Sequence, residues 1–132
     1  MNTLLWIGQA LLAAVFLFSG IFKSIKSPEY LVKMGQTGVE GVPTPVLKFI
    51  GITEIMGSVG IILPWYLGVY PILTPIVAVC FAIIMVMAIC IHLKRSRASI
   101  ECRAKEVGNA RNNAIILLVS ILVAIGRFAM LD

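Results

Sequence analysis

Four long apolar runs constrain this chain more than any other feature, because each is close to the length that crosses a lipid bilayer. The runs lie at about residues 3–23, 45–64, 71–93 and 110–128. A bilayer core about 30 Å thick needs roughly 20 helical residues, so we predict four transmembrane helices. The runs do not alternate polar and apolar side chains with a period of two, which argues against the strands of a membrane β-barrel.

Composition supports a lipid environment for these runs. Hydrophobic residues make up 60% of the 132 residues and charged residues only 13%, whereas a soluble domain is about one half apolar and about one quarter charged. A soluble fold of this length cannot hide so much apolar surface, because small domains keep much of their surface exposed. We therefore expect an all-α integral membrane four-helix bundle, formed by residues 1–132 as a single transmembrane domain in contact with the lipid bilayer.

The first run has a second interpretation, as a cleaved signal peptide. Such a peptide begins with a basic segment and ends at a cleavage site of small residues. The first three residues carry no basic side chain, and the basic residues Lys23 and Lys26 follow the run instead. We therefore expect the run to be a retained span.

Basic residues lie almost entirely on one side of the predicted bundle. Ten of the eleven lie between spans one and two, counting the start of span two, or between spans three and four; Arg127 is the exception. Because Lys and Arg near span ends prefer the cytoplasm, both termini should face outward, as in a multi-pass protein of the bacterial inner (cell) membrane. Four aromatic residues would then lie at the outer interface, where such rings anchor: Trp6, Trp65, Tyr66 and Tyr70.

The net charge of +5 follows from this topology and requires no nucleic-acid partner. No stretch interleaves basic and aromatic residues in the manner of a nucleic-acid surface. The basic stretch 94–111 can extend spans three and four beyond the membrane as helix, although Gly108 and Asn109 favour a break there. Between spans one and two, Ser27, Pro28 and Glu29 predict the start of a short helix.

Three ionisable side chains in or at the ends of the spans are candidate binding residues: Lys23, Glu54 and His92. A charge inside a membrane usually faces the bundle interior and finds a partner. On a helix, Glu54 shares a face with Gly51 and Ser58, where small residues let a neighbouring helix approach. The long side chain of Lys23 can then reach Glu54, and we expect all three candidates to converge in the cytoplasmic half of the bundle.

Two interpretations of this cluster remain open. In the structural one, a buried Lys23–Glu54 pair fixes the helix register and His92 lies at the level of the lipid headgroups. In the functional one, the cluster titrates or holds the polar head of a ligand. We predict no metal site, because the chain has one histidine and no clustered thiolates.

The three cysteines do not indicate a redox enzyme. Cys80 and Cys90 lie ten residues apart on one predicted helix, roughly 15 Å along its axis, so they cannot pair within the chain. Cys102 is expected to be a free thiol on the reducing cytoplasmic side. Because no C-x-x-C motif is present, a self-contained thiol–disulfide oxidoreductase is disfavoured, and we assign no catalytic residue.

Two sequence motifs resemble those of the DoxX-like family. Phe16, Gly20 and Lys23 form an F-x-x-x-G-x-x-K motif at the end of span one. The stretch from Gly51 to Pro64 is similar to the G-x-x-E-x-x-G-x-x-G-L-x-L-P segment of span two, and a histidine near the end of span three also fits. The likeness covers all four spans and is specific in the first two. The basic stretch from 95 to 105 is longer than we expect for a compact member.

The resemblance implies a four-span membrane protein but no single chemistry. The family takes its name from a subunit linked to thiosulfate and quinone oxidation, and its relatives include members of bacterial oxidative-stress complexes and distant animal proteins that assist membrane-receptor assembly. It implies that Lys23, Glu54 and His92 occupy polar motif positions.

Three functions are consistent with these features. The first is a non-catalytic accessory or assembly partner, which binds another membrane protein or forms a homo-oligomer. The second is a quinone-linked redox subunit whose polar pocket binds a quinone head, and here alone a cofactor is expected. The third is a small proton- or cation-coupled transporter that uses Glu54.

Overall fold

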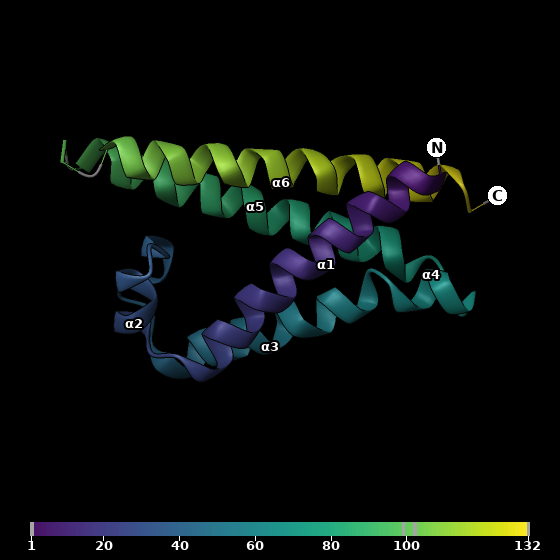
Figure 1. The fold of residues 1–132 in the computed structure, drawn as a ribbon, viewed down its shortest axis with the longest axis horizontal. Coiled ribbons are helices and arrows are strands. Elements are labelled where there is room, and N and C mark those ends of the chain that lie inside the picture. Colours follow the sequence, from purple (N-terminus) through teal and green to yellow (C-terminus); the bar gives the residue numbers. More distant parts are fainter. Residues whose placement is uncertain (1, 99, 102, 132) are drawn as a thin grey trace.

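The computed structural model describes residues 2–98, 100–101 and 103–131, and this part of the chain contains helices and no strand. Four segments are long and apolar enough to cross a membrane. They are α1 (Asn2–Ile25), α3 (Thr44–Gly60) together with α4 (Leu63–Leu67), α5 (Leu73–Ala98) and α6 (Arg103–Ala129). The expected all-α membrane bundle is therefore confirmed (Figure 1).

The four spans form two pairs of neighbouring helices. α1 packs along α3 and α5 packs along α6, and the two pairs meet chiefly where α1 crosses α6 (Figure 1). Both chain termini lie at one end of the bundle, which we call the termini end. The opposite end, which we call the loop end, holds the connections from α1 to α3 and from α5 to α6.

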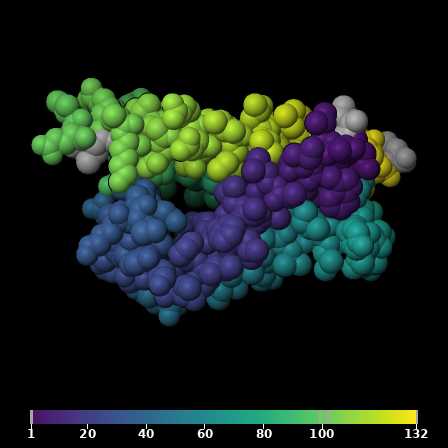
Figure 2. Space-filling view, viewed as in Figure 1, coloured from purple at the N-terminus to yellow at the C-terminus, as the bar shows by residue number. Residues whose placement is uncertain are grey.

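The two pairs diverge toward the loop end, and the connection from α1 to α3 occupies the space between them (Figure 2). This connection contains α2 (Pro28–Lys33) and the 3-10 helix η1 (Thr37–Val39). Leu31 and Val39 pack with Leu47 of α3 in a small apolar cluster. On its other side the connection approaches α5, where Gly38 lies against the ring of His92. The connection thus joins the two helix pairs.

A hydrophobic core fills the middle of the bundle. The rings of Phe16 and Phe81 stack with their centroids 3.8 Å apart, and Leu12, Ile61 and Val123 are buried in the same cluster. Only 22–28% of the most apolar window of each span is buried inside the protein. Most apolar side chains therefore face outward, as a bundle surrounded by hydrocarbon requires.

α1 and α3 approach each other closely at a pair of glycines. A Cβ atom on Gly20 would lie 2.6 Å from the carbonyl oxygen of Gly51, and one on Gly51 would lie 2.7 Å from the carbonyl oxygen of Gly20. Both positions are buried. The backbones can approach this closely because neither residue has a side chain, as is common between membrane helices.

The expected start of a short helix at Ser27, Pro28 and Glu29 is confirmed by α2. The hydroxyl of Ser27 accepts a hydrogen bond of 3.2 Å from the backbone N–H of Tyr30, as an N-cap does. The expected second span divides into α3 and α4, because Pro64 lacks an N–H and its ring would clash with the carbonyl of Gly60 in a continuous helix.

The expected break at Gly108 and Asn109 is wrong, because both residues lie inside α6. One glycine within a helix costs only about 1 kcal/mol, and the flanking residues Glu106 and Ala110 are both buried. The extension of spans three and four as helix is confirmed on both sides of the connection.

Cys80 and Cys90 are free and exposed on α5, and Cys102 lies outside the described residues.

A pair of glycine substitutions tests this packing. We expect Gly20→Ala to lower the free energy of unfolding by about 1–3 kcal/mol, the usual penalty for overpacking, since its Cβ would meet backbone atoms. Gly108→Ala is the matched control: in the part of the chain that the structure describes, a Cβ atom there would meet no atom within 4 Å beyond its own turn of helix, and alanine favours helix by about 1 kcal/mol. Thermal unfolding in detergent should move in opposite directions for the two variants. Equal shifts would contradict a close crossing at Gly20.

Candidate functional site

Lys23 and Glu54 form an ion pair between α1 and α3. The Nζ atom of Lys23 donates to Oε1 of Glu54 over 2.8 Å, and the two side chains are 16% and 2% exposed. The contact that the sequence predicts between these two residues is therefore confirmed.

Helix geometry explains why this pair forms beside the glycine crossing. Each member follows its glycine by three residues, about 4.5 Å along the axis. α1 and α3 run in opposite directions (Figure 1), so these steps lead away from each other. Side chains in a helix lean toward its N-terminus, however, so Lys23 and Glu54 lean back toward one another across the crossing.

His92 belongs to a different group of side chains. Its Nδ1 atom lies 2.6 Å from Oε2 of Glu106, and both residues are buried. Among the described residues, no hydrogen bond or ion pair joins His92 to Lys23 or Glu54. The structure therefore places His92 in a hydrogen-bonded group separate from the pair of Lys23 and Glu54. His92 is buried within the protein at 8% exposure, and its neighbours are Glu106 on α6 and Gly38 on η1.

The carboxylate of Glu106 also bonds to Arg95, which extends the group to the loop-end surface. Nε of Arg95 donates to Oε1 of Glu106 over 3.2 Å, and Nη2 of Arg95 donates to Oε2 of Glu40 over 2.5 Å. This network joins α5, α6 and the end of η1. Sequence reasoning missed Glu106, although His92 and Arg95 are spaced three residues apart and so share a helix face.

A second polar group lies at the termini end and was also missed. Arg127 of α6 is fully buried; its Nε donates to Oε1 of Gln9 and its Nη1 to Oδ1 of Asn2, each over 2.6 Å. Gln9 in turn donates through Nε2 to the carbonyl of Ile61, over 2.6 Å. These bonds join α1 and α6 to the residue that directly follows α3. Gln9 is a polar residue well inside the first apolar run, and that position was the available signal.

Two tryptophans lie against the guanidinium of Arg127. Its Cζ atom is 4.4 Å from the ring centre of Trp65 and 5.1 Å from that of Trp6. Such cation–π contacts stabilise a desolvated charge. Arg127, Gln9, Asn2, Trp6 and Trp65 are called the arginine cluster below.

The second carboxylate oxygen of Glu54 can still bind another group. Its Oε2 atom is buried and has no hydrogen-bond partner among the described residues. A carboxylate oxygen in this state can accept a proton or a hydrogen bond from a donor. No group of three or more His, Cys, Asp or Glu side chains that could hold a metal ion occurs in the described part of the chain.

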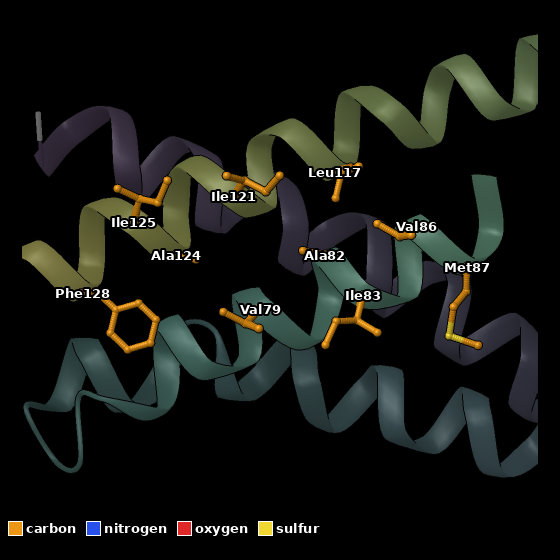
Figure 3. A pocket seen from close by; sticks show the side chains of 10 residues that line it. All are labelled: Val79, Ala82, Ile83, Val86, Met87, Leu117, Ile121, Ala124, Ile125 and Phe128. Carbon is orange, nitrogen blue, oxygen red and sulfur yellow. The ribbon is translucent and has the colours of Figure 1, made fainter. Parts of the chain in front are cut away.

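An apolar groove runs between α5 and α6 (Figure 3). All ten lining residues are apolar: Val79, Ala82, Ile83, Val86, Met87, Leu117, Ile121, Ala124, Ile125 and Phe128. A second groove lies along α3 and α4 and includes Met56 and Tyr70. Neither groove is lined by any of the three candidates from the sequence.

Comparison with known proteins identifies one family. Residues 7–123 match the family described as DoxX-like, whereas no curated protein and no solved structure matches the chain. The matched region contains Lys23, Glu54, His92 and Glu106. Arg127, Asn2 and Trp6 of the arginine cluster lie outside it.

The ion pair predicts a specific pattern of stabilities. Lys23→Met strands the carboxylate of Glu54, and removal of one partner from a buried pair costs roughly 3–5 kcal/mol in soluble proteins. Glu54→Gln should be milder, because the amide still forms hydrogen bonds, and the double variant should recover stability relative to Lys23→Met. Lys48→Met is the control, since Lys48 is exposed on α3. Thermal unfolding of the purified proteins measures the cycle; strictly additive losses would show that the residues do not interact.

Proposed function

The chain belongs to the DoxX-like family, and we propose that this multi-pass membrane protein acts as a non-catalytic accessory or assembly partner of a membrane complex. The family match carries the membrane assignment. The narrower role rests on how the polar side chains of the spans are used.

The pairing of ionisable side chains inside the bundle is the observation that favours this role. Lys23 bonds to Glu54, and His92 and Arg95 both bond to Glu106. Each bond joins two different helices, so these groups stabilise the arrangement of the spans. A general acid or base must instead lie within hydrogen-bond reach of a substrate, and the described grooves are lined by other residues.

The groove between α5 and α6 supports association with another membrane protein or with a second copy of the chain. Its lining is wholly apolar, and it includes the small residues Ala82 and Ala124 (Figure 3). Small side chains let a second transmembrane helix approach closely, where packing replaces contacts with lipid.

A proton- or cation-coupled transporter is the second candidate, and one observation favours it. Oε2 of Glu54 is buried and unpartnered among the described residues, so this carboxyl group can bind a proton or a cation.

A quinone-linked function has less support. A quinone head needs polar groups at the wall of a cavity, and neither described groove is lined by Lys23, Glu54 or His92.

Site-specific photo-crosslinking tests the accessory role. A photoreactive residue at Ile125, in the groove, should give a defined adduct with one membrane protein or with a second copy, identified by mass spectrometry. Phe18 on α1 is the matched control, because both side chains are 63% exposed and Phe18 lines neither described groove. Adducts with lipid alone at both positions, together with Glu54-dependent ion movement in vesicles, would instead support the transporter.

We further propose that both termini face away from the cytoplasm in a bacterial inner membrane. Ten of the eleven basic residues lie in or beside the two connections at the loop end, from α1 to α3 and from α5 to α6. Basic residues near span ends prefer the cytoplasm. The location of both termini at one end of the bundle is consistent with this orientation (Figure 1).

A pair of C-terminal reporters checks the orientation. Alkaline phosphatase, which folds only outside the cytoplasm, should be active when fused to the C-terminus. A fluorescent protein that matures only in the cytoplasm should be dark in the same position. The reverse result would show that the charge distribution does not set the topology.

A further inference from the structure

Arg127 differs from the other buried charges because the described residues leave part of its guanidinium unused. The group carries five N–H donors. Nε donates to Gln9, and Nη1 donates to Asn2 and, over 3.5 Å, to the sulfur of Met130. Nη2 is buried and has no partner among the described residues, so both of its N–H groups lack an acceptor.

The charge of Arg127 also lacks a counter-ion among the described residues. Ion pairs there involve Lys23, His92 and Arg95 as the cationic partners, and none involves Arg127. An arginine cannot lose its proton in a protein, so burial does not neutralise it. The rings of Trp6 and Trp65 offset part of the desolvation, but they supply no oxygen to Nη2. An anionic acceptor would satisfy both the charge and the free donors.

The position of the cluster indicates the source of that acceptor. Arg127 lies two residues before the end of α6, Asn2 and Trp6 belong to the first turns of α1, and Trp65 lies in the short helix α4. The start of α1, the end of α6 and the short helix α4 all lie at the termini end of the bundle (Figure 1). Tryptophans gather at the membrane interface, which is where the phosphates of phospholipids lie.

We propose that Nη2 of Arg127 binds a phosphate oxygen at the termini end, and that a phospholipid headgroup supplies it. Guanidinium groups bind phosphate with short charge-assisted hydrogen bonds. Gln9 and Asn2 hold Nε and Nη1, which fixes the plane of the group and leaves Nη2 for the ligand. Because Nη2 is covered by neighbouring side chains, the phosphate reaches it when one of the half-buried rings, Trp6 or Trp65, moves aside.

The chain carries its own reporter for this event. It contains two tryptophans, and both lie against Arg127. Their fluorescence can be followed in a phosphorus-free detergent and a phosphate-free buffer. Three titrants separate the sources: dioctanoyl phosphatidylglycerol, dioctanoylglycerol with the same acyl chains and no phosphate, and inorganic phosphate.

We expect a saturable fluorescence change with the phospholipid and none with dioctanoylglycerol. Arg127→Gln should abolish the change. Arg127→Lys keeps the charge but cannot hold Gln9, Asn2 and a phosphate together, so its apparent affinity should fall about tenfold or more, the loss of one charge-assisted hydrogen bond. Arg97→Gln, which removes an exposed arginine at the loop end, is the control and should behave as the unaltered chain.

Three outcomes would overturn the proposal. An equal response to dioctanoylglycerol would show that acyl chains alone bind. A response that persists in both Arg127 variants would show that the phosphate binds elsewhere. An Arg127-dependent response to inorganic phosphate at the same concentrations as the phospholipid would assign the site to a free oxyanion and reject the lipid headgroup.

Discussion

The crossing of α1 over α3 at Gly20 and Gly51 is the contact on which the first helix pair depends. Two backbones meet there without intervening side chains, which sets both the distance between the helices and their register. The ion pair of Lys23 and Glu54 follows from that register, because their side chains lean toward each other across the crossing. A wider separation would leave a carboxylate without its partner inside the membrane, where such a group is strongly unfavourable.

Polar bonds lie at both ends of the bundle, and the stacked rings of Phe16 and Phe81 lie in its apolar middle. Lipid is as apolar as the side chains it surrounds, so apolar contacts alone favour one arrangement of helices only weakly. Hydrogen bonds between helices favour one arrangement more strongly, because the bilayer core contains no water that could bind a polar group left unpaired. The network of Glu106 at the loop end and the arginine cluster at the termini end therefore specify how the two pairs meet.

The four spans could be predicted because hydrocarbon imposes a length and a composition that are visible in the sequence. The pairing of Lys23 with Glu54 could also be predicted, since each residue lies beside small residues on one face of its helix. The partner of His92 could not, because Glu106 lies in a basic stretch where a break was expected, and a helix face is undefined until the helix is known to continue. Arg127 was counted only as a terminal charge, because nothing local indicates that three distant helices enclose it.

The division into two pairs has a consequence for the order in which the molecule is assembled. Each pair consists of consecutive spans, and chains are synthesised from the N-terminus, so α1 and α3 can pack before α5 and α6 exist. The bonds of Arg127 to Gln9 and Asn2 join residues separated by 118 and 125 positions. These bonds can form only after the fourth span has been inserted, so α1 and α6 are joined later than the helices within each pair.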